Sequence, residues 1–256
     1  MRKIALAAAI ALAASATAPA IAATAVEPPA QEWSFDGVFG TFDRNQLKRG
    51  FQVFREVCSA CHSLKLVAFR NLKDPGGPEF TEAEAKAIAA GFQVPSLDDT
   101  GQPTTRDGIL ADHFPLVYPN DIAAHAANNG AAPPDLSLMA KARENGPDYI
   151  HAIMVGFHEA PEGFTVPEGA HYNEYMPGHV IAMAPPLKDG QVEYAEANVP
   201  RTVDQYGKDV AAFLMWAAEP KLEARHRLGM GVIIFLSLLS VLLFLSYRRV
   251  WRNIDH

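Results

Sequence analysis

A run of nineteen residues without a charged side chain, from Leu228 to Ser246, constrains this chain more than any other feature. As an α-helix rising about 1.5 Å per residue it would be roughly 28 Å long, enough to cross the hydrocarbon core of a membrane. A tyrosine, a tryptophan and three arginines follow at once, and such residues gather at the cytoplasmic interface. A buried core helix is the alternative. The sequence therefore predicts a single span of the lipid bilayer over 228–246 and a short cytoplasmic tail over 247–256.

The opposite end of the chain has the three parts of a secretory signal peptide. Residues 1–3 are basic at two positions, Ile4–Ala14 are apolar, and small residues follow at 20–22. An N-terminal membrane anchor is disfavoured because the apolar part is mostly alanine and a proline interrupts the segment. We expect a signal peptide over 1–23, cleaved near 22–25. Export would place the following domain in the periplasm of a bacterium, anchored in the inner (cytoplasmic) membrane.

The residues between these segments, 26–222, are enough for one domain. From Val26 to Arg227 there are 28 acidic and 17 basic side chains, a net charge near −11. Such a surface repels nucleic acid, so no nucleic-acid partner is expected, and it would attract basic partners.

Both cysteines of the chain lie in one pentapeptide, Cys58-Ser59-Ala60-Cys61-His62. This C-x-x-C-H pattern is typical of c-type haem attachment, in which each thiol forms a thioether and the histidine becomes a ligand of the iron. A redox-active pair would follow a strand of a βαβ unit, a zinc site would need further soft ligands, and a surface disulfide would not require the histidine. The motif predicts one haem c, bound covalently through Cys58 and Cys61, with His62 as an axial ligand.

The second axial position decides whether the iron carries electrons or binds a substrate. A methionine sulfur opposite histidine raises the reduction potential. Met154 and Met215 lie in segments that look helical and are expected to fill the core. Met176 and Met183 lie in irregular chain with prolines, and the two prolines after Met183 would restrict its loop. This spacing favours Met183 over Met176, and several histidines remain as rivals.

Periodic apolar residues predict a helix over Asp43–Val57 that runs into the haem motif, and another that starts near Pro200 and stops at Pro220. Gly50 and Gly207 would permit these two helices to cross closely. Shorter helices are expected over 81–91, 121–128 and 136–144, with loops between them. The predicted fold class is mainly α: a cytochrome c-like haem domain with long loop insertions plus one C-terminal transmembrane helix.

Several blocks of sequence, taken together and in this order, closely resemble the cytochrome c1 family, the haem subunits of the ubiquinol–cytochrome c oxidoreductase (bc1) complex, in its bacterial type. The similarity covers nearly all of the mature chain. The blocks are 49–54 leading into the haem motif, 126–131, 133–137, 182–186 and 213–220.

The resemblance implies that His62 and Met183 are the axial ligands. It also implies a set of residues at the haem, with the arginine meeting a propionate: Arg143, Tyr149, Asn128 and Pro134. Some bacterial members have an additional disulfide, which this chain has no cysteines to form.

The function implied by the resemblance is electron relay. The Rieske iron–sulfur protein, having taken an electron from quinol at cytochrome b, would reduce this haem, which would then reduce a soluble basic c-type cytochrome. The chain would be a subunit of a quinol–cytochrome c oxidoreductase without catalytic residues of its own. Glu82, Glu84, Asp98 and Asp99 are candidate docking carboxylates. The alternatives are a stand-alone membrane-anchored electron shuttle, and a haem enzyme or gas sensor with an open iron position.

The ligand assignment predicts different outcomes for two methionine substitutions. Met183→Leu should lower the midpoint potential markedly and open the iron to added ligands, because a thioether would be lost. Met176→Leu should leave both properties nearly unchanged. Redox titration and carbon monoxide binding measure the two effects. A larger effect from Met176→Leu would show that the assignment is wrong.

Overall fold

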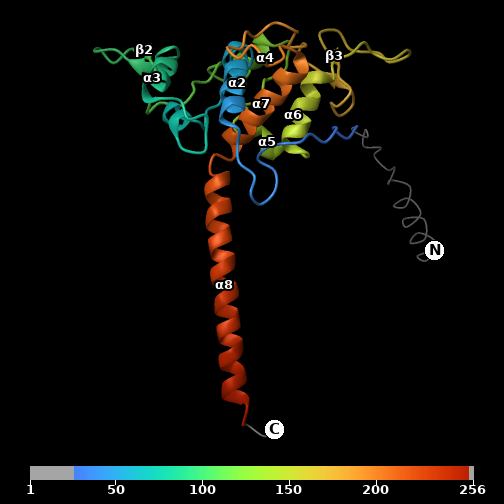
Figure 1. Ribbon diagram of the computed structural model, residues 1–256. Coiled ribbons are helices and arrows are strands. Elements are labelled where there is room, and N and C mark those ends of the chain that lie inside the picture. The colour runs from blue at the N-terminus through green and yellow to red at the C-terminus, as the bar shows by residue number, and fades with distance from the viewer. Residues whose placement is uncertain (1–25, 254–256) are drawn as a thin grey trace, which may run out of the picture.

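The computed structural model describes residues 26–253, so the predicted signal peptide over 1–23 and its cleavage site lie outside the described residues. The structure is mainly helical, as predicted. A helical domain carries one long helix, α8 (Leu222–Trp251), that projects from one end (Figure 1).

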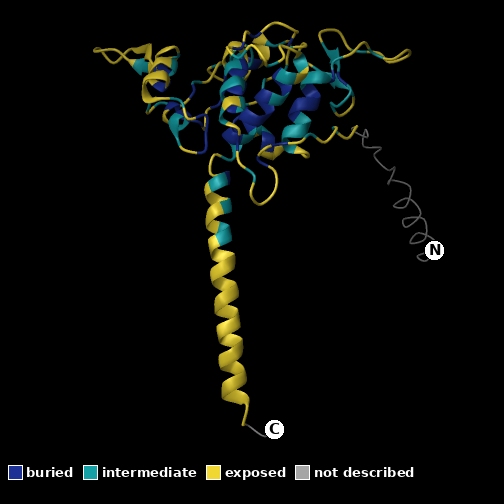
Figure 2. Cartoon of the chain, in the orientation of Figure 1, coloured by how far each residue is buried: buried dark blue, intermediate teal, exposed yellow. Residues whose placement is uncertain are grey.

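The core of the domain forms around α2 (Arg44–Glu56), α6 (Gly146–Val155) and α7 (Val203–Ala218). α7 packs against both of the others, and its middle residues are buried (Figure 2). The Asp43 side chain caps α2 by accepting hydrogen bonds from the backbone N–H groups of the next turn. Aromatic rings fill the space between α2, α7 and the neighbouring loops. The buried members of this cluster are Phe51, Phe54, Phe69, Phe114, Phe213 and Trp216.

α2 and α7 cross at Gly50, as predicted. A Cβ atom at Gly50 would lie only 2.0 Å from the backbone oxygen of Asp209, so only glycine permits this approach. Beside the crossing, the fully buried Asp209 carboxylate accepts a hydrogen bond from Arg49 Nε at 2.9 Å. The expectation for Gly207 was wrong, because this residue faces His151 of α6 and not α2.

The shorter helices confirm most of the predicted segments. α3 (Glu82–Ala90) starts with the capping box of Thr81 and Glu84, and α4 (Asp121–Ala127) matches the segment expected there. α5 (Met139–Ala142) is much shorter than the predicted 136–144, because the chain just before it is hydrogen-bonded to the segment that follows the haem motif. Short 3-10 helices are η1 (Cys58–Ala60) and η2 (Phe69–Lys73).

Two small antiparallel hairpins project from different sides of the domain (Figure 1). β1 (Gln93–Leu97) pairs with β2 (Pro103–Asp107), with Val94 opposite Arg106. β3 (His171–Tyr172) pairs with β4 (Val180–Ile181). These strands are few and short, in agreement with the predicted fold class.

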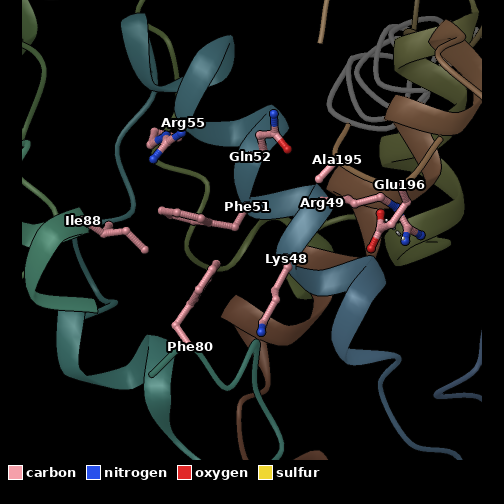
Figure 3. A pocket seen from close by; sticks show the side chains of 9 residues that line it. All are labelled: Lys48, Arg49, Phe51, Gln52, Arg55, Phe80, Ile88, Ala195 and Glu196. Atoms are coloured by element: carbon pink, nitrogen blue, oxygen red, sulfur yellow. Dashed lines mark hydrogen bonds and ion pairs between the residues drawn. The ribbon is translucent and has the colours of Figure 1, made fainter. Parts of the chain in front are cut away.

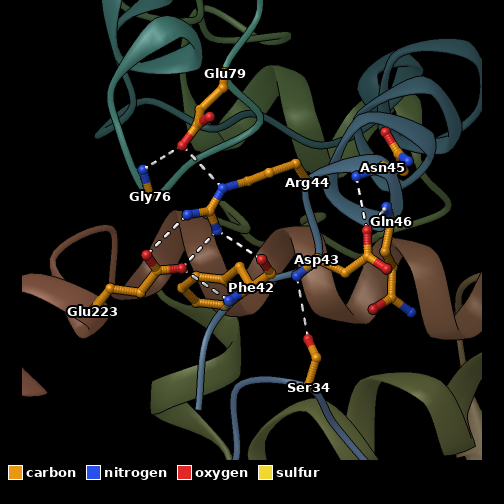
Figure 4. Close-up of polar contacts among 9 residues, drawn as sticks. All are labelled: Ser34, Phe42, Asp43, Arg44, Asn45, Gln46, Gly76, Glu79 and Glu223. Carbon is orange, nitrogen blue, oxygen red and sulfur yellow. Dashed lines mark hydrogen bonds and ion pairs between the residues drawn. The ribbon is translucent and has the colours of Figure 1, made fainter. Parts of the chain in front are cut away.

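α8 is bound to the domain through its first turn. The helix begins at Leu222, six residues before the predicted span of 228–246, and the Leu222 side chain is buried. The Glu223 carboxylate accepts hydrogen bonds from Arg44 Nη1 and Nη2 at 2.6 and 2.9 Å and from the backbone N–H of Phe42 at 2.9 Å (Figure 4). From residue 231 onward the helix is exposed (Figure 2), and the mean hydropathy of an 18-residue window within it is 2.7, so it is long and apolar enough to cross a membrane.

The close crossing predicts that Gly50→Ala lowers the free energy of unfolding by about 1–3 kcal/mol, as overpacking does. The added carbon would meet a backbone oxygen, which cannot move away as a side chain can. Gly91→Ala is the matched control, because this exposed residue has an ordinary φ of −75°. Denaturant unfolding followed by circular dichroism measures both variants. Equal stability of Gly50→Ala and the native chain would contradict the crossing.

Candidate haem site

The haem motif follows directly on the end of α2, so the core helix positions it. The backbone N–H groups of Cys61 and His62 both donate to the carbonyl oxygen of Cys58, at 3.1 and 2.9 Å. The two thiols and the imidazole therefore come from one tight turn. Cys58 is half-buried against the core, whereas Cys61 is exposed.

The environment of Cys58 does not suit a redox-active thiol pair. Burial, with a smaller contribution from the charge of Cys61, raises the pKa of the Cys58 thiol to about 12. A redox-active C-x-x-C pair has a lowered pKa instead, because the thiolate is the reactive form. A buried thiol with a raised pKa is therefore poorly suited to disulfide exchange.

The His62 imidazole is fixed by a backbone carbonyl. Its Nδ1 lies 2.7 Å from the carbonyl oxygen of Pro134, which can only accept, so Nδ1 carries the proton. Burial lowers the pKa of His62, and the neutral ring then keeps a lone pair on Nε2. A neutral imidazole with its other nitrogen held by a carbonyl is the form that binds iron.

The Pro134 carbonyl is itself held by the segment after the haem motif. Two segments without regular secondary structure, 63–66 and 134–137, are joined by hydrogen bonds of backbone and side-chain groups. The bonds are Leu136 N to Ser63 O at 2.9 Å, Lys65 N to Asp135 Oδ2 at 2.9 Å and Leu66 N to Ser137 Oγ at 3.1 Å. Asp135 and Ser137 were not predicted as site residues, and only their place in a resemblance block pointed to this region.

The structure distinguishes the two candidate methionines. Met176 lies in the turn between β3 and β4, where its sulfur accepts a hydrogen bond from the Tyr149 hydroxyl at 3.6 Å. The buried side chain of Asn173, which the sequence did not single out, fixes this hairpin to α6 by donating to Ile153 O at 2.9 Å. Met183 lies beyond β4 in irregular chain and is half-buried. The sulfur of Met176 is thus already engaged within the protein.

The structure brings Arg143 and Tyr149 together. Tyr149 is half-buried in α6, and Arg143 follows α5. Burial raises the pKa of the Tyr149 phenol, and the adjacent Arg143 guanidinium opposes this by a hydrogen bond and its charge. The permanent cation of Arg143 can donate hydrogen bonds to an anion such as a carboxylate.

Asn128 has a mainly local role in the structure. Its amide donates to Ala124 O at 2.7 Å at the end of α4, and its Oδ1 lies 3.4 Å from the Tyr118 hydroxyl. The contact of Asn128 with haem therefore stays a prediction.

The donor set fits haem c. Two thiols on one turn, an imidazole with a free Nε2 and an available thioether are the groups that such a cofactor requires. A groove of about 260 Å³ beside α2 is a different feature (Figure 3). None of the predicted haem-binding residues lines it, and its walls include Lys48, Phe80 and Glu196.

Comparison with known proteins identifies the family. The sequence model described as the Cytochrome C1 family matches residues 33–254. The chain belongs to the cytochrome c1 family. Cytochrome c1 proteins carry one covalently attached haem c, and Cys58 and Cys61 occupy the attachment motif here. They are the haem subunits of bc1 complexes in bacteria and mitochondria.

Relatives include bacterial and mitochondrial proteins. The chain is 45% identical over 261 residues to "Cytochrome c1" of Blastochloris viridis, covering 94% of this chain and 92% of that one. It is 46% identical over 226 residues to "Cytochrome c1 1, heme protein, mitochondrial" of Arabidopsis thaliana, covering 88% and 72%. It is 47% identical over 247 residues to "Cytochrome b/c1" of Bradyrhizobium diazoefficiens; this match covers 89% of the chain but only 36% of that longer protein.

The hydrogen bonds between segments 63–66 and 134–137 predict that Asp135→Ala lowers the free energy of unfolding. The half-buried carboxylate accepts from the backbone N–H groups of Lys65 and Ser137, and hydrogen bonds to charged groups contribute about 1.5–3 kcal/mol. We expect a decrease of that size in the free energy of unfolding, measured by denaturant titration. Asp99→Ala, at an exposed turn, is the control. Similar free energies of unfolding for the two variants would show that these hydrogen bonds contribute little to stability.

Proposed function

We propose that this chain is the electron-transfer subunit of a bc1 complex. It would accept electrons from the Rieske iron–sulfur subunit and deliver them to a soluble basic c-type cytochrome. It would work beside cytochrome b and catalyse no bond chemistry of its own. The observation that carries the proposal is the haem motif with His62 fixed on the Pro134 carbonyl, in a chain that matches the family over almost all of its described length.

The protein residues have separate tasks in this proposal. Cys58 and Cys61 hold the cofactor, and His62 and Met183 occupy the two axial positions. Bound haem c supplies a one-electron site, which no side chain of this protein provides. With both axial positions filled, no position is left for a substrate.

Arg143 would donate hydrogen bonds to a haem propionate, and Tyr149 would lie beside it at the haem. Their proximity supports this role, because a propionate held away from water requires a charge-assisted donor. Pro134 would act through its carbonyl on His62, and Asn128 would line the haem.

The membrane arrangement follows from the two ends of the chain. We propose that α8 crosses the bacterial inner membrane once, with the haem domain in the periplasm and the C-terminus in the cytoplasm. The signal-peptide pattern at residues 1–23 and the arginines after residue 247 both support this orientation.

The acidic balance of the domain supports a basic acceptor, whose encounter rate should fall with added salt. Three of the four candidate docking carboxylates already form ion pairs or hydrogen bonds with nearby residues. Glu82 pairs with lysines, Glu84 belongs to the capping box, and Asp98 accepts hydrogen bonds within its own turn. Asp99 is exposed and is therefore the most available of the four.

Purification in mild detergent tests the proposal against its alternatives. We expect cytochrome b and a Rieske subunit to copurify with the native chain and to give quinol-dependent reduction of an added c-type cytochrome. A stand-alone shuttle would purify without these subunits. Carbon monoxide binding to the native reduced protein would indicate an open iron position and would favour an enzyme or sensor.

A further inference from the structure

The segment just before α2 forms a narrow, well-supported loop with an apolar tip. Gly37 and Gly40 flank Val38 and Phe39, and the backbone N–H of Gly40 donates to the Gly37 carbonyl at 3.3 Å. Gly37 has a φ of +74°, and a Cβ atom at Gly40 would collide with the backbone of Phe35, so both glycines are needed for the turn. Val38 is 59% exposed and Phe39 is 82% exposed.

The neck of this loop is rigid. The backbone N–H of Thr41 donates to the carbonyl of Ser34 at 2.9 Å, which closes the loop. At the base of the loop, the buried rings of Trp33 and Phe35 stack with centroids 5.4 Å apart, and the buried ring of Phe42 packs at a tilt against Phe35 with centroids 5.1 Å apart. The exposure of the tip is therefore imposed by the fold, since the base cannot turn the two apolar side chains inward.

The same loop is fixed to the first turn of α8. Glu223 accepts hydrogen bonds from the Phe42 backbone and from Arg44, and Arg44 Nε also donates to Glu79 at 2.9 Å (Figure 4). In Figure 1 the blue segment before α2 hangs below the domain, on the side from which α8 projects. The loop and the apolar helix thus point in the same direction from a shared ion-pair cluster.

The loop lies at the height along α8 at which the interfacial layer of a membrane would begin. The uncharged run of α8 starts at Leu228, five residues beyond Glu223, which is about 7–8 Å along the helix. The polar interfacial layer above the hydrocarbon is itself about 5–8 Å thick. A loop that descends from the level of Glu223 would therefore bring its tip into this layer.

We propose that Val38 and Phe39 form a second membrane contact, inserted into the interfacial layer of the lipid bilayer beside α8. The proposal rests on the membrane insertion of α8 put forward above. Together with the Glu223 cluster, this contact would limit rocking of the haem domain about the start of α8. A lipid surface is favoured because the tip offers only one aliphatic and one aromatic side chain between glycines, without a charged group to specify a protein partner.

Site-directed spin labelling tests this contact. Because haem attachment uses both native cysteines, Phe39→Cys would carry the only free thiol of the chain. The haem-loaded full chain is labelled with a nitroxide and reconstituted into phospholipid vesicles. Collision with oxygen, which partitions into lipid, is then compared with collision with a water-soluble nickel complex. Val241→Cys in α8 is the lipid reference, and Asp99→Cys on the β1–β2 turn is the aqueous reference.

We expect the oxygen-to-nickel ratio at position 39 to be several-fold above that at position 99 and to approach that at 241. A ratio equal to that at 99, with 241 still lipid-like, would overturn the loop contact and leave the anchor intact. An aqueous label at 241 would overturn the anchor itself and this inference with it. In the intact complex, with the unsubstituted complex as labelling background, shielding of position 39 from both reagents would assign the tip to a protein partner and also overturn the proposal.

Discussion

The hydrogen bond between His62 Nδ1 and the Pro134 carbonyl is the contact on which the rest of the site depends. It determines the tautomer of the imidazole, and so which nitrogen is available to iron. Because the acceptor is a backbone carbonyl, its position depends on how firmly the surrounding segment is held. Hydrogen bonds between residues 63–66 and 134–137 hold this segment in place, and the crossing of α2 and α7 at Gly50 holds the helix that precedes the haem motif.

Support for the site extends from this contact to the membrane. α2 ends at the haem motif and begins at Arg44, which the Glu223 carboxylate ties to the first turn of α8. One helix therefore connects the cofactor to the membrane-proximal cluster. The buried pair of Arg49 and Asp209 lies between these ends, where removal of either partner would leave an uncompensated charge. In the proposed electron-transfer role, this rigid support would keep the haem in a fixed position relative to α8.

Local patterns in the sequence predicted the features that depend on neighbours along the chain. The helix that leads into the haem motif, the short helix predicted over 81–91 and the haem turn all follow from spacings of a few residues. The contacts of Asp135 and Asn173 could not be predicted in this way, since they join segments that are remote in sequence. Gly207 shows the same limit: helical periodicity identified a close-packed position but not the helix that packs there. Loop spacing and the resemblance both favoured Met183; the hydrogen bond from Tyr149 to Met176 is in agreement with that choice, which stays a prediction.

X-ray absorption at the iron edge measures most directly whether the iron has an imidazole as one axial ligand and a thioether as the other. The sample is the haem-loaded full chain purified in detergent, which contains no other iron. The account predicts six-coordinate iron with five nitrogen donors and one sulfur donor in the reduced protein. Six nitrogen donors, or five-coordinate iron, would contradict it.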